Sequence, residues 1–516
     1  MTSSVTRPFL RSRPALIVLV AGSLASLAGC DSARSSAEPR AVSSVLGLMG
    51  GRTSNQPWSG PVVMDGDISE WPRETVAFAD DQFFYLRFSV EGEPRALQAS
   101  DQTVTIHLDI DGNGGTGATL LDPIDAAGMG VDLEIVFSPR KPDGTLASGA
   151  AAAIVDASGT RTRIPTAALD LLFTPTYASG WYEVRISRHV ATGTDTSAFE
   201  EAGPWEGVIT LADNGGQIRG WSDAFLATKP AAADQPVLSD ALMPGKPEGA
   251  IRVLNWNVLW NSPEKNPASF VRVIESVRPD VVLLQEWVAD EPAQIARWFT
   301  ERIDSPTGSW HALHGKSRGI AIVAPHPITP LIKDGVEFPH NGRDHGARFV
   351  AGIVPLPVGD IVVGSTHLKC CGSAGSPEDV TRIAEARAIA TTLGAAMVSD
   401  PTWVRVIGGD MNLVGTRTPL DEIGRGLDVD GSGLAAAPVR VLGERATYTW
   451  VDWNTPFTPG RLDWVLYSDA GSEVLNAFAI DTRRLSDAAL ARMGLDRMDS
   501  AGSDHLPVVV DVRIRK

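Results

Sequence analysis

Apolar and polar positions alternate with different periods in different parts of the chain. Between about residues 61 and 228, short apolar runs are separated by clusters of Gly, Asp, Asn and Pro, and three such runs are residues 83–88, 104–108 and 133–137. Apolar runs of this length, bounded by turn residues, are typical of strands in antiparallel sheets. This region is therefore predicted to form an all-β sandwich.

The pattern changes after residue 250, where apolar runs alternate with amphipathic helical segments such as 267–277 and 378–393. Strands that alternate with helices indicate an α/β domain. Between the two regions, residues 229–249 are rich in Pro, Ala and Asp and lack an apolar face, as a linker does. We therefore predict a β-sandwich domain over residues 58–228, a linker over 229–249, and an α/β domain over 250–516.

The chain begins with a segment that does not fit either domain. Three arginines precede an apolar run over residues 14–27, which is too short to span a bilayer. The run ends in Leu27-Ala28-Gly29-Cys30, which resembles the lipobox of bacterial lipoproteins. The resemblance implies a signal peptide over 1–29, lipidation of Cys30, and an exported protein anchored in the bacterial envelope, periplasmic or on the outer face of a membrane. An ordinary secretory signal with an incidental cysteine is the alternative.

Residues 30–57 are rich in Ser, Ala, Gly and Arg without apolar periodicity, so we expect a flexible tether there. The composition of the whole chain, with 516 residues, 43% of them hydrophobic and 21% charged, excludes a fully disordered or collagen-like protein. The net charge is −17. A dedicated nucleic-acid binder would carry a basic excess, because Lys and Arg supply most of its non-specific affinity for phosphate. This chain has no such excess.

Three cysteines leave little room for disulfides. Once Cys30 is lipidated, only the adjacent Cys370 and Cys371 remain, either as free thiols or as a vicinal disulfide. A disulfide framework and a zinc site with Cys/His spacing are both excluded.

The predicted sandwich carries two stretches with a recognisable pattern, Met64-Asp65-Gly66-Asp67-Ile68-Ser69-Glu70-Trp71-Pro72 and Ala79-Asp80-Asp81-Gln82-Phe83-Phe84-Tyr85-Leu86. They resemble family-9-like carbohydrate-binding and DOMON-type sandwiches, which implies a glycan as ligand. Trp58 and Trp71 could stack on a sugar, but we expect a buried position in the core instead.

A separate feature of the sandwich is a run of oxygen-bearing side chains at alternate positions, Asp109, Asp111 and Asn113. This spacing could wrap Ca²⁺ in a tight loop. The alternative is a Gly-rich turn whose acidic side chains bind their own backbone.

Six motifs in the C-terminal half place a polar residue where an apolar strand begins or ends. In chain order they are Val253-Leu254-Asn255-Trp256-Asn257-Val258, Asp280-Val281-Val282-Leu283-Leu284-Gln285-Glu286, Gly364-Ser365-Thr366-His367-Leu368, Val406-Ile407-Gly408-Gly409-Asp410-Met411-Asn412, Arg461-Leu462-Asp463-Trp464-Val465-Leu466 and Ser503-Asp504-His505-Leu506-Pro507. In this order the motifs resemble the endonuclease/exonuclease/phosphatase superfamily. The resemblance implies a deoxyribonuclease I-like, four-layer αββα sandwich.

The resemblance also implies a metal site and its ligands. Glu286 would be the main metal carboxylate, with Asn257 and Asp504 beside it. Oxygen ligands that leave water molecules in place suit Mg²⁺ or Mn²⁺.

Five further residues would carry the catalytic chemistry by the same resemblance. Asp410 would orient or deprotonate the attacking water, and Asn412 would donate to a phosphoryl oxygen. His505, oriented by Asp463, would contact the phosphate or act as the acid–base group, and His367 is the other histidine of the site.

Several residues near these motifs remain ambiguous. Asp463 could instead pair with Arg461, and Arg348 could contact phosphate or lie at a solvated edge. Leu259 stands where the abasic-site endonucleases of the family have an acidic residue, which argues against that activity because Leu cannot bind a cation.

We expect a monomeric, membrane-anchored and divalent-metal-dependent phosphoesterase, most simply a phosphodiesterase or endonuclease that uses metal-activated water. Nucleic acid is one candidate for its phosphoester substrate. The alternatives are a phospholipid, as for a sphingomyelinase, or a small organic phosphate. A third possibility is a non-catalytic surface protein that binds glycans.

Overall fold

The computed structural model describes residues 46–47, 62–73, 75–120, 128–189, 204–227, 238–289, 291–315, 319–397 and 403–515. Outside these ranges lie the signal peptide, Cys30, the expected tether apart from the backbone of residues 46–47, Trp58 and the first half of the expected linker. Val42–Lys516 form one compact unit, and Met1–Ala41, the other unit, are not described. Among the helices in the described ranges, none is both long and apolar enough to cross a membrane.

The N-terminal region consists of strands joined by short 3-10 turns. The strands are β1 (Leu46–Gly47), β2 (Ala77–Ala79), β3 (Phe83–Val90), β4 (Thr103–Asp109), β5 (Leu133–Phe137), β6 (Ala150–Val155), β7 (Arg161–Ile164), β8 (Leu172–Thr174), β9 (Trp181–Ser187), β10 (Trp205–Ala212), β11 (Ile218–Trp221) and β12 (Phe225–Ala227). The 3-10 turns are η1 (Ile68–Glu70), η2 (Leu97–Ala99) and η3 (Thr166–Leu169).

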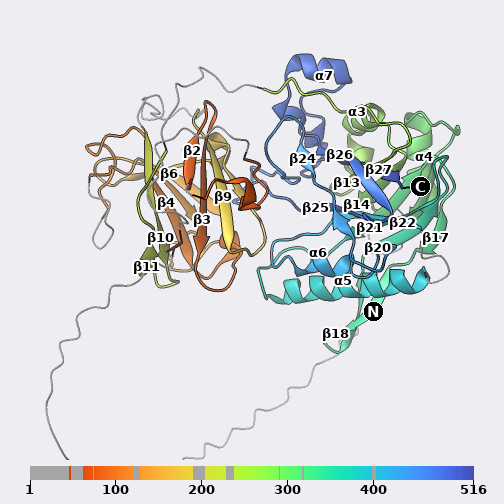
Figure 1. Cartoon of the computed structure of the whole chain (residues 1–516), viewed down its shortest axis with the longest axis horizontal. Coiled ribbons are helices and arrows are strands. Elements are labelled where there is room, and N and C mark those ends of the chain that lie inside the picture. Colours follow the sequence, from red (N-terminus) through yellow and green to blue (C-terminus); the bar gives the residue numbers. More distant parts are fainter. Residues whose placement is uncertain are drawn as a thin grey trace, which may run out of the picture. The chain divides into compact units, whose positions relative to one another are not determined.

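These strands form two antiparallel sheets (Figure 1). One has the order β1-β3-β9-β8, with β2 beside β3, and the other has the order β11-β10-β4-β5-β6-β7, with β12 beside β10. Side chains from both sheets, such as Phe84, Ile106, Ile135 and Val184, are fully buried in one cluster. The predicted all-β architecture is thereby confirmed.

The C-terminal region contains the remaining strands and all the described α-helices. The strands are β13 (Ile251–Asn257), β14 (Val281–Gln285), β15 (His311–His314), β16 (Ile320–Ala324), β17 (Thr329–Ile332), β18 (Val336–His340), β19 (Arg343–Ala347), β20 (Phe349–Val354), β21 (Ile361–His367), β22 (Val404–Asp410), β23 (Ala435–Ala436), β24 (Arg440–Val441), β25 (Asp463–Tyr467), β26 (Ser472–Ala479) and β27 (Val508–Ile514). The helices and 3-10 turns are α2 (Ser262–Lys265), α3 (Pro267–Val277), α4 (Pro292–Arg302), α5 (Pro377–Ala396), α6 (Thr418–Ile423), η4 (Thr482–Arg484), α7 (Asp487–Met493) and η5 (Ser500–Gly502).

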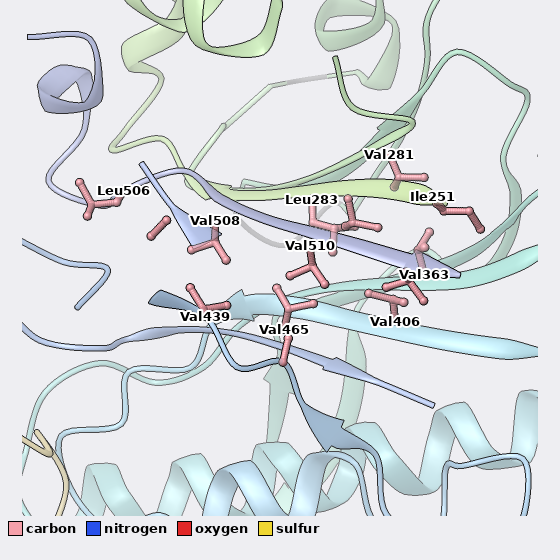
Figure 2. Packing of buried hydrophobic residues seen from close by; sticks show 14 of the residues in the cluster. Ile251, Val281, Leu283, Val363, Val406, Val439, Val465, Leu506, Val508 and Val510 are labelled. Atoms are coloured by element: carbon pink, nitrogen blue, oxygen red, sulfur yellow. The ribbon is translucent and has the colours of Figure 1, made fainter. Parts of the chain in front are cut away.

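Two mixed sheets form the centre of this region. The first has the order β15-β16-β14-β13-β27-β26-β24 and the second β17-β20-β21-β22-β25-β23, while β18 and β19 form a separate hairpin. The inner faces of the two sheets pack through small branched side chains, with Leu283 and Val510 from the first sheet above Val363, Val406 and Val465 from the second (Figure 2). Close packing of this kind supplies most of the stability of a two-sheet core.

Helices cover the outer face of each sheet (Figure 1). On the first sheet, Phe270 and Ile274 of α3 and Phe299 of α4 pack against the strands in one buried cluster. On the second sheet, Ile389 of α5 and Ile423 of α6 do the same. The predicted four-layer αββα architecture is therefore confirmed.

The N-terminal and C-terminal regions share buried contacts. Met64, Trp71 and Leu172 belong to the same apolar cluster as the core between the two C-terminal sheets. Trp71 is 3% exposed and lies in the core, as expected. The backbone also crosses the boundary, because Met64 donates to the carbonyl of Arg445 at 2.9 Å.

An ion-pair network crosses the same boundary. Asp170, at the end of η3, accepts hydrogen bonds from both terminal nitrogens of Arg484, one of them at 2.6 Å. Arg185 of β9 reaches Glu444 at 2.7 Å and Asp170 at 3.5 Å, and its side chain is only 2% exposed. Burial alone would raise the pKa of Asp170, but the two arginines hold it below its ordinary value. The network is thus a buried structural link between the two regions.

Asp170→Ala should lower the free energy of unfolding of the full chain by about 3 kcal/mol, because it leaves the buried Arg185 and Arg484 short of an anion. The control is Asp487→Ala, which removes the exposed ion pair with Arg497 and should cost less than about 1 kcal/mol. Denaturant unfolding of both variants measures the difference. Equal stability of the two variants would show that the network does not link the regions.

Candidate active site

Strand register brings the polar residues of the C-terminal motifs to one end of the two sheets. In the parallel pair β21 and β22, His367 lies opposite Asp410. In the antiparallel pair β22 and β25, Asp410 lies opposite Asp463. In the first sheet Asn257 ends β13 opposite the last residue of β14, and Glu286 follows directly. Residues that are far apart in sequence therefore meet because apolar strands end at the same level.

Glu286 is held at the end of β14 by its neighbours. Its Oε1 accepts from Nδ2 of Asn257 at 3.2 Å, and its Oε2 accepts from the backbone N–H of Trp260 at 3.3 Å. Glu286 has φ +62, and Leu259 and Trp260 also have positive φ. Left-handed backbone at residues other than glycine is costly and persists where surrounding contacts enforce it. The carboxylate is therefore held in place by the backbone as well as by Asn257.

Asp410 lies at the centre of the site and is buried. Its Oδ2 accepts from Nδ2 of Asn257 at 3.1 Å and lies 3.4 Å from Nε2 of His367 and 3.6 Å from Nε2 of His505. Its Oδ1 accepts from the backbone N–H of Asn412 at 3.0 Å. Both histidines thus face one carboxylate oxygen.

Asp463 and His505 form a buried pair beside Asp410. Nδ1 of His505 lies 2.7 Å from Oδ2 of Asp463, and the hydroxyl of Thr449 donates to the same oxygen at 2.8 Å. Arg461 does not pair with Asp463 and instead lies over the ring of Trp464 and donates to a backbone carbonyl. Because Nδ1 of His505 contacts Asp463, its Nε2 is directed toward Asp410.

His367 is in contact with a cation. Arg348 donates to Leu368 O at 2.8 Å, and its Nη1 lies 3.1 Å from Nδ1 of His367. Arg348 is therefore a half-buried neighbour of His367. The sequence showed this arginine, but no local spacing indicates that it contacts His367, because the contact joins β21 to the end of β19.

The two histidines differ in their electrostatic surroundings. Burial lowers the pKa of His367 well below its ordinary value, and the charges of Arg348 and His505 lower it further. Burial also opposes protonation of His505, but the carboxylates of Asp463 and Asp410 outweigh it and raise the pKa of His505. Burial raises the pKa of Asp410, and the charge of the nearby His505 offsets part of this rise. Titratable groups whose pKa values are shifted in opposite directions can act as acid and base within one site.

Asn412 and Asp504 flank these groups. Asn412 has φ +49, and its Nδ2 donates to the carbonyl of Leu368 at 3.2 Å. Asp504 accepts from the indole N–H of Trp450 at 3.0 Å. Sequence reasoning did not find Trp450 as a partner of Asp504, because 54 residues separate the two.

The oxygen donors of Glu286, Asn257 and Asp504 are of the kind that a hard divalent cation binds. Glu286 and Asp504 are half-buried carboxylates, and Asn257 carries an amide oxygen whose contact is the backbone N–H of Leu259 at 3.2 Å. Mg²⁺ is commonly held by one or two carboxylates and several water molecules. These residues fit such an ion, and an all-protein cage is not needed.

The loop after β4 brings two of the expected residues together with a third carboxylate. Asp109, Asp111 and Asp132 bring carboxylate oxygens within 4.8 Å of one another, and this is the only such group of acidic, His or Cys residues found within the described ranges. The side-chain oxygen of Asn113 accepts from the N–H of Gly115 at 3.0 Å. Asp132 follows Asp109 by 23 residues, so spacing along the chain gave no signal for it.

The polar residues at these strand ends line a cleft of about 610 Å³. Glu286, His367, Asp410, Asn412 and His505 all line it. Cys370 and Cys371, which are free thiols with their sulfurs 2.9 Å apart, lie at the same cleft. An ester bond placed in this cleft would meet acidic, amide and imidazole groups at once.

Residues 254–505 match the profile of the Endonuclease/Exonuclease/phosphatase family. No curated protein matches the chain at a significant level.

Solved structures similar to this half of the chain have low sequence identity. A humanised TDP2 from D. rerio has 14% identity and a TM-score of 0.34, covering 52% of this chain and 100% of its own. Sphingomyelinase C from Streptomyces griseocarneus has 17% identity and a TM-score of 0.33, covering 51% and 99%. A beta toxin mutant from Staphylococcus aureus, with bound magnesium ions, has 15% identity and a TM-score of 0.34, covering 51% and 99%.

The profile begins inside β13 and ends at His505, so it includes every strand end of the two C-terminal sheets that carries a polar residue of the site. The endonuclease/exonuclease/phosphatase profile therefore matches the part of the C-terminal half that supplies these strand ends.

Proposed function

We propose that this domain hydrolyses phosphodiesters with a divalent metal ion, Mg²⁺ or Mn²⁺, held by Glu286, Asn257 and Asp504. The observation that carries the proposal is the convergence of the His505–Asp463 pair, Asp410 and Glu286 on one cleft. The family match over the same residues supports it. A bound Mg²⁺ would neutralise charge on the phosphoryl oxygens and lower the pKa of a water molecule.

The residues of the chain would divide the remaining work. Asp410 would orient the attacking water, since its Oδ2 is directed into the space between the two histidines. His505, kept protonated by Asp463 and Asp410, would donate to a phosphoryl oxygen as negative charge develops there. Neutral His367 would help hold Asp410, and Asn412 would fix Asp410 Oδ1 through its backbone N–H.

The substrate could be nucleic acid, a phospholipid or a small organic phosphodiester, and endonucleolytic, exonucleolytic and phosphatase activities all fit the same set of groups. The lipobox-like Cys30 supports export and lipid anchoring in the bacterial envelope. A non-catalytic glycan-binding role is the weaker alternative, because no polar residue of the six motifs is replaced by an apolar one.

Glu286→Gln should reduce hydrolysis of bis(4-nitrophenyl) phosphate by about 10²-fold or more, since the variant loses the main anionic ligand of the cation. Isothermal titration of Mg²⁺ into the full chain should show weaker binding in the same variant. Glu275→Gln, on the exposed face of α3, is the matched control and should keep both properties. Full activity of Glu286→Gln would contradict the assigned metal site.

Asp463→Asn should lower kcat by about 10²- to 10⁴-fold, because the neutral amide no longer favours protonated His505 or fixes its orientation. Asp469→Asn, at the exposed far end of β25, should leave kcat unchanged. Steady-state kinetics with saturating Mg²⁺ compares the two. An unchanged kcat in Asp463→Asn would remove His505 from the mechanism.

Lipid anchoring is tested by expressing the full chain in a bacterium supplied with a labelled fatty acid. The wild type should incorporate the label and sediment with membranes, whereas Cys30→Ala should do neither because it lacks the acylated thiol. Cys371→Ala is the control that keeps Cys30. An unlabelled wild-type protein would contradict the anchor.

A further inference from the structure

The cleft that contains the catalytic-type residues has a second wall, which comes from the N-terminal sandwich. This wall consists of residues 96 and 98–100 around η2, residues 146–148 before β6, and Thr176 after β8, all of which line the same cleft as Glu286, Asp410 and His505. We refer to these residues as the sandwich wall. A substrate whose phosphorus lies near His505 therefore has sandwich residues on its other side.

Hydrogen bonds hold the sandwich wall against the catalytic domain. The side-chain amide of Gln98 is paired at both ends with Thr458, donating to the hydroxyl at 3.0 Å and accepting from the backbone N–H at 2.9 Å. Both residues are buried. Ala150, two residues after the wall, donates to the carbonyl of Pro456 at 2.7 Å. The wall near β6 is thus attached to the segment that also supplies Phe457 and Thr458 to the cleft.

A second attachment lies at Thr176. Its hydroxyl donates to the carbonyl of Leu413 at 2.8 Å, and the backbone N–H of Ala178 donates to the carbonyl of Gly415 at 2.7 Å. Thr176 also contacts the backbone at Gly460 so closely that a Cβ at that glycine would lie 2.3 Å from its methyl group. Because buried hydrogen bonds and close packing fix the wall on two sides, it has a defined position relative to the catalytic groups.

The chemistry of the sandwich wall is neutral. Ala96, Ala99, Leu146 and Ala147 are apolar, and Ser100 and Ser148 offer only hydroxyl groups. Among all the described residues that line the cleft, none is Lys or Arg, and the lining carboxylates are Glu286 and Asp410. The cleft can therefore accommodate one phosphoryl group at the metal and His505, whereas its described lining residues include no Lys or Arg for a second phosphate.

We propose that the sandwich wall determines substrate specificity, and that the substrate is a phosphodiester with a single phosphoryl group whose second organic group packs against this wall. A polynucleotide fits poorly, because its successive phosphates require a positively charged track along the cleft. The proposal rests on the phosphodiesterase activity proposed above, and it makes the sandwich part of the active site.

The test uses the full chain and two synthetic diesters that share a leaving group and differ in the other ester group. Methyl 4-nitrophenyl phosphate has a second group too small to reach the wall, whereas bis(4-nitrophenyl) phosphate has an aromatic one. Ala147→Trp and Ser148→Trp fill the space in front of the wall. Residue 148 is exposed and residue 147 half-buried, so neither substitution requires a cavity in the core. Thr162→Trp, on the exposed part of β7, is the control.

The two wall variants should lower kcat/KM for the bis-aryl diester by about tenfold or more while changing that for the methyl diester by less than about threefold. Thr162→Trp should change neither. Equal losses on both diesters, or no loss on either, would show that the second ester group does not contact the wall and would overturn the proposal. Circular dichroism and thermal unfolding of each variant verify that it is folded.

A third substrate tests the exclusion of polynucleotides. Single-stranded oligonucleotides and supercoiled plasmid should be cleaved with a kcat/KM at least about 100-fold below that of the bis-aryl diester, because flanking phosphates find no Lys or Arg among the described residues that line the cleft. Cleavage of either nucleic acid as fast as the diester would overturn the single-phosphate inference while supporting the hydrolase. Absence of metal-dependent hydrolysis with every substrate would instead overturn the proposed function itself, and the inference with it.

Discussion

The register between β21, β22 and β25 is the constraint on which the site depends. It places His367, Asp410 and Asp463 side by side at the end of one sheet, and Asn257 from the other sheet reaches the same Asp410 oxygen. Because side chains alternate along a strand, a shift of one residue would turn Asp410 away from the cleft. The two-sheet core therefore fixes the catalytic geometry as well as the stability, and the small branched side chains between the sheets keep the two strand ends at one level.

Burial of charge follows from this arrangement. Asp410, Asp463, His367 and His505 are all buried, so none of them can rely on water to balance its charge. The pKa values of the two histidines shift in opposite directions because their neighbours differ, with Arg348 beside His367 and two carboxylates beside His505. Such a site is costly in stability and useful for proton transfer, which is common for active sites.

The sequence predicted the two sheet-rich regions, the α/β texture and the residues at the strand ends, because each of these depends on local apolar patterning or on motifs of a few residues. It did not predict the partners that come from distant loops. Trp450 on Asp504, Arg348 on His367 and Asp132 beside Asp109 are contacts made by tertiary packing. For the same reason, the sequence did not predict the shared core residues and hydrogen bonds between the two regions.

The central claim, that Glu286 and its neighbours hold a catalytic cation, is tested most directly by locating Mn²⁺ in crystals of the full chain through its anomalous scattering. The account predicts a peak within about 2.2 Å of a Glu286 carboxylate oxygen, in the space bounded by Asn257 and Asp504, because Mn²⁺ shares the oxygen-ligand preference of Mg²⁺. A Mn²⁺ concentration that saturates hydrolysis, with a peak only at Asp109, Asp111 and Asp132 or no peak at all, would contradict it.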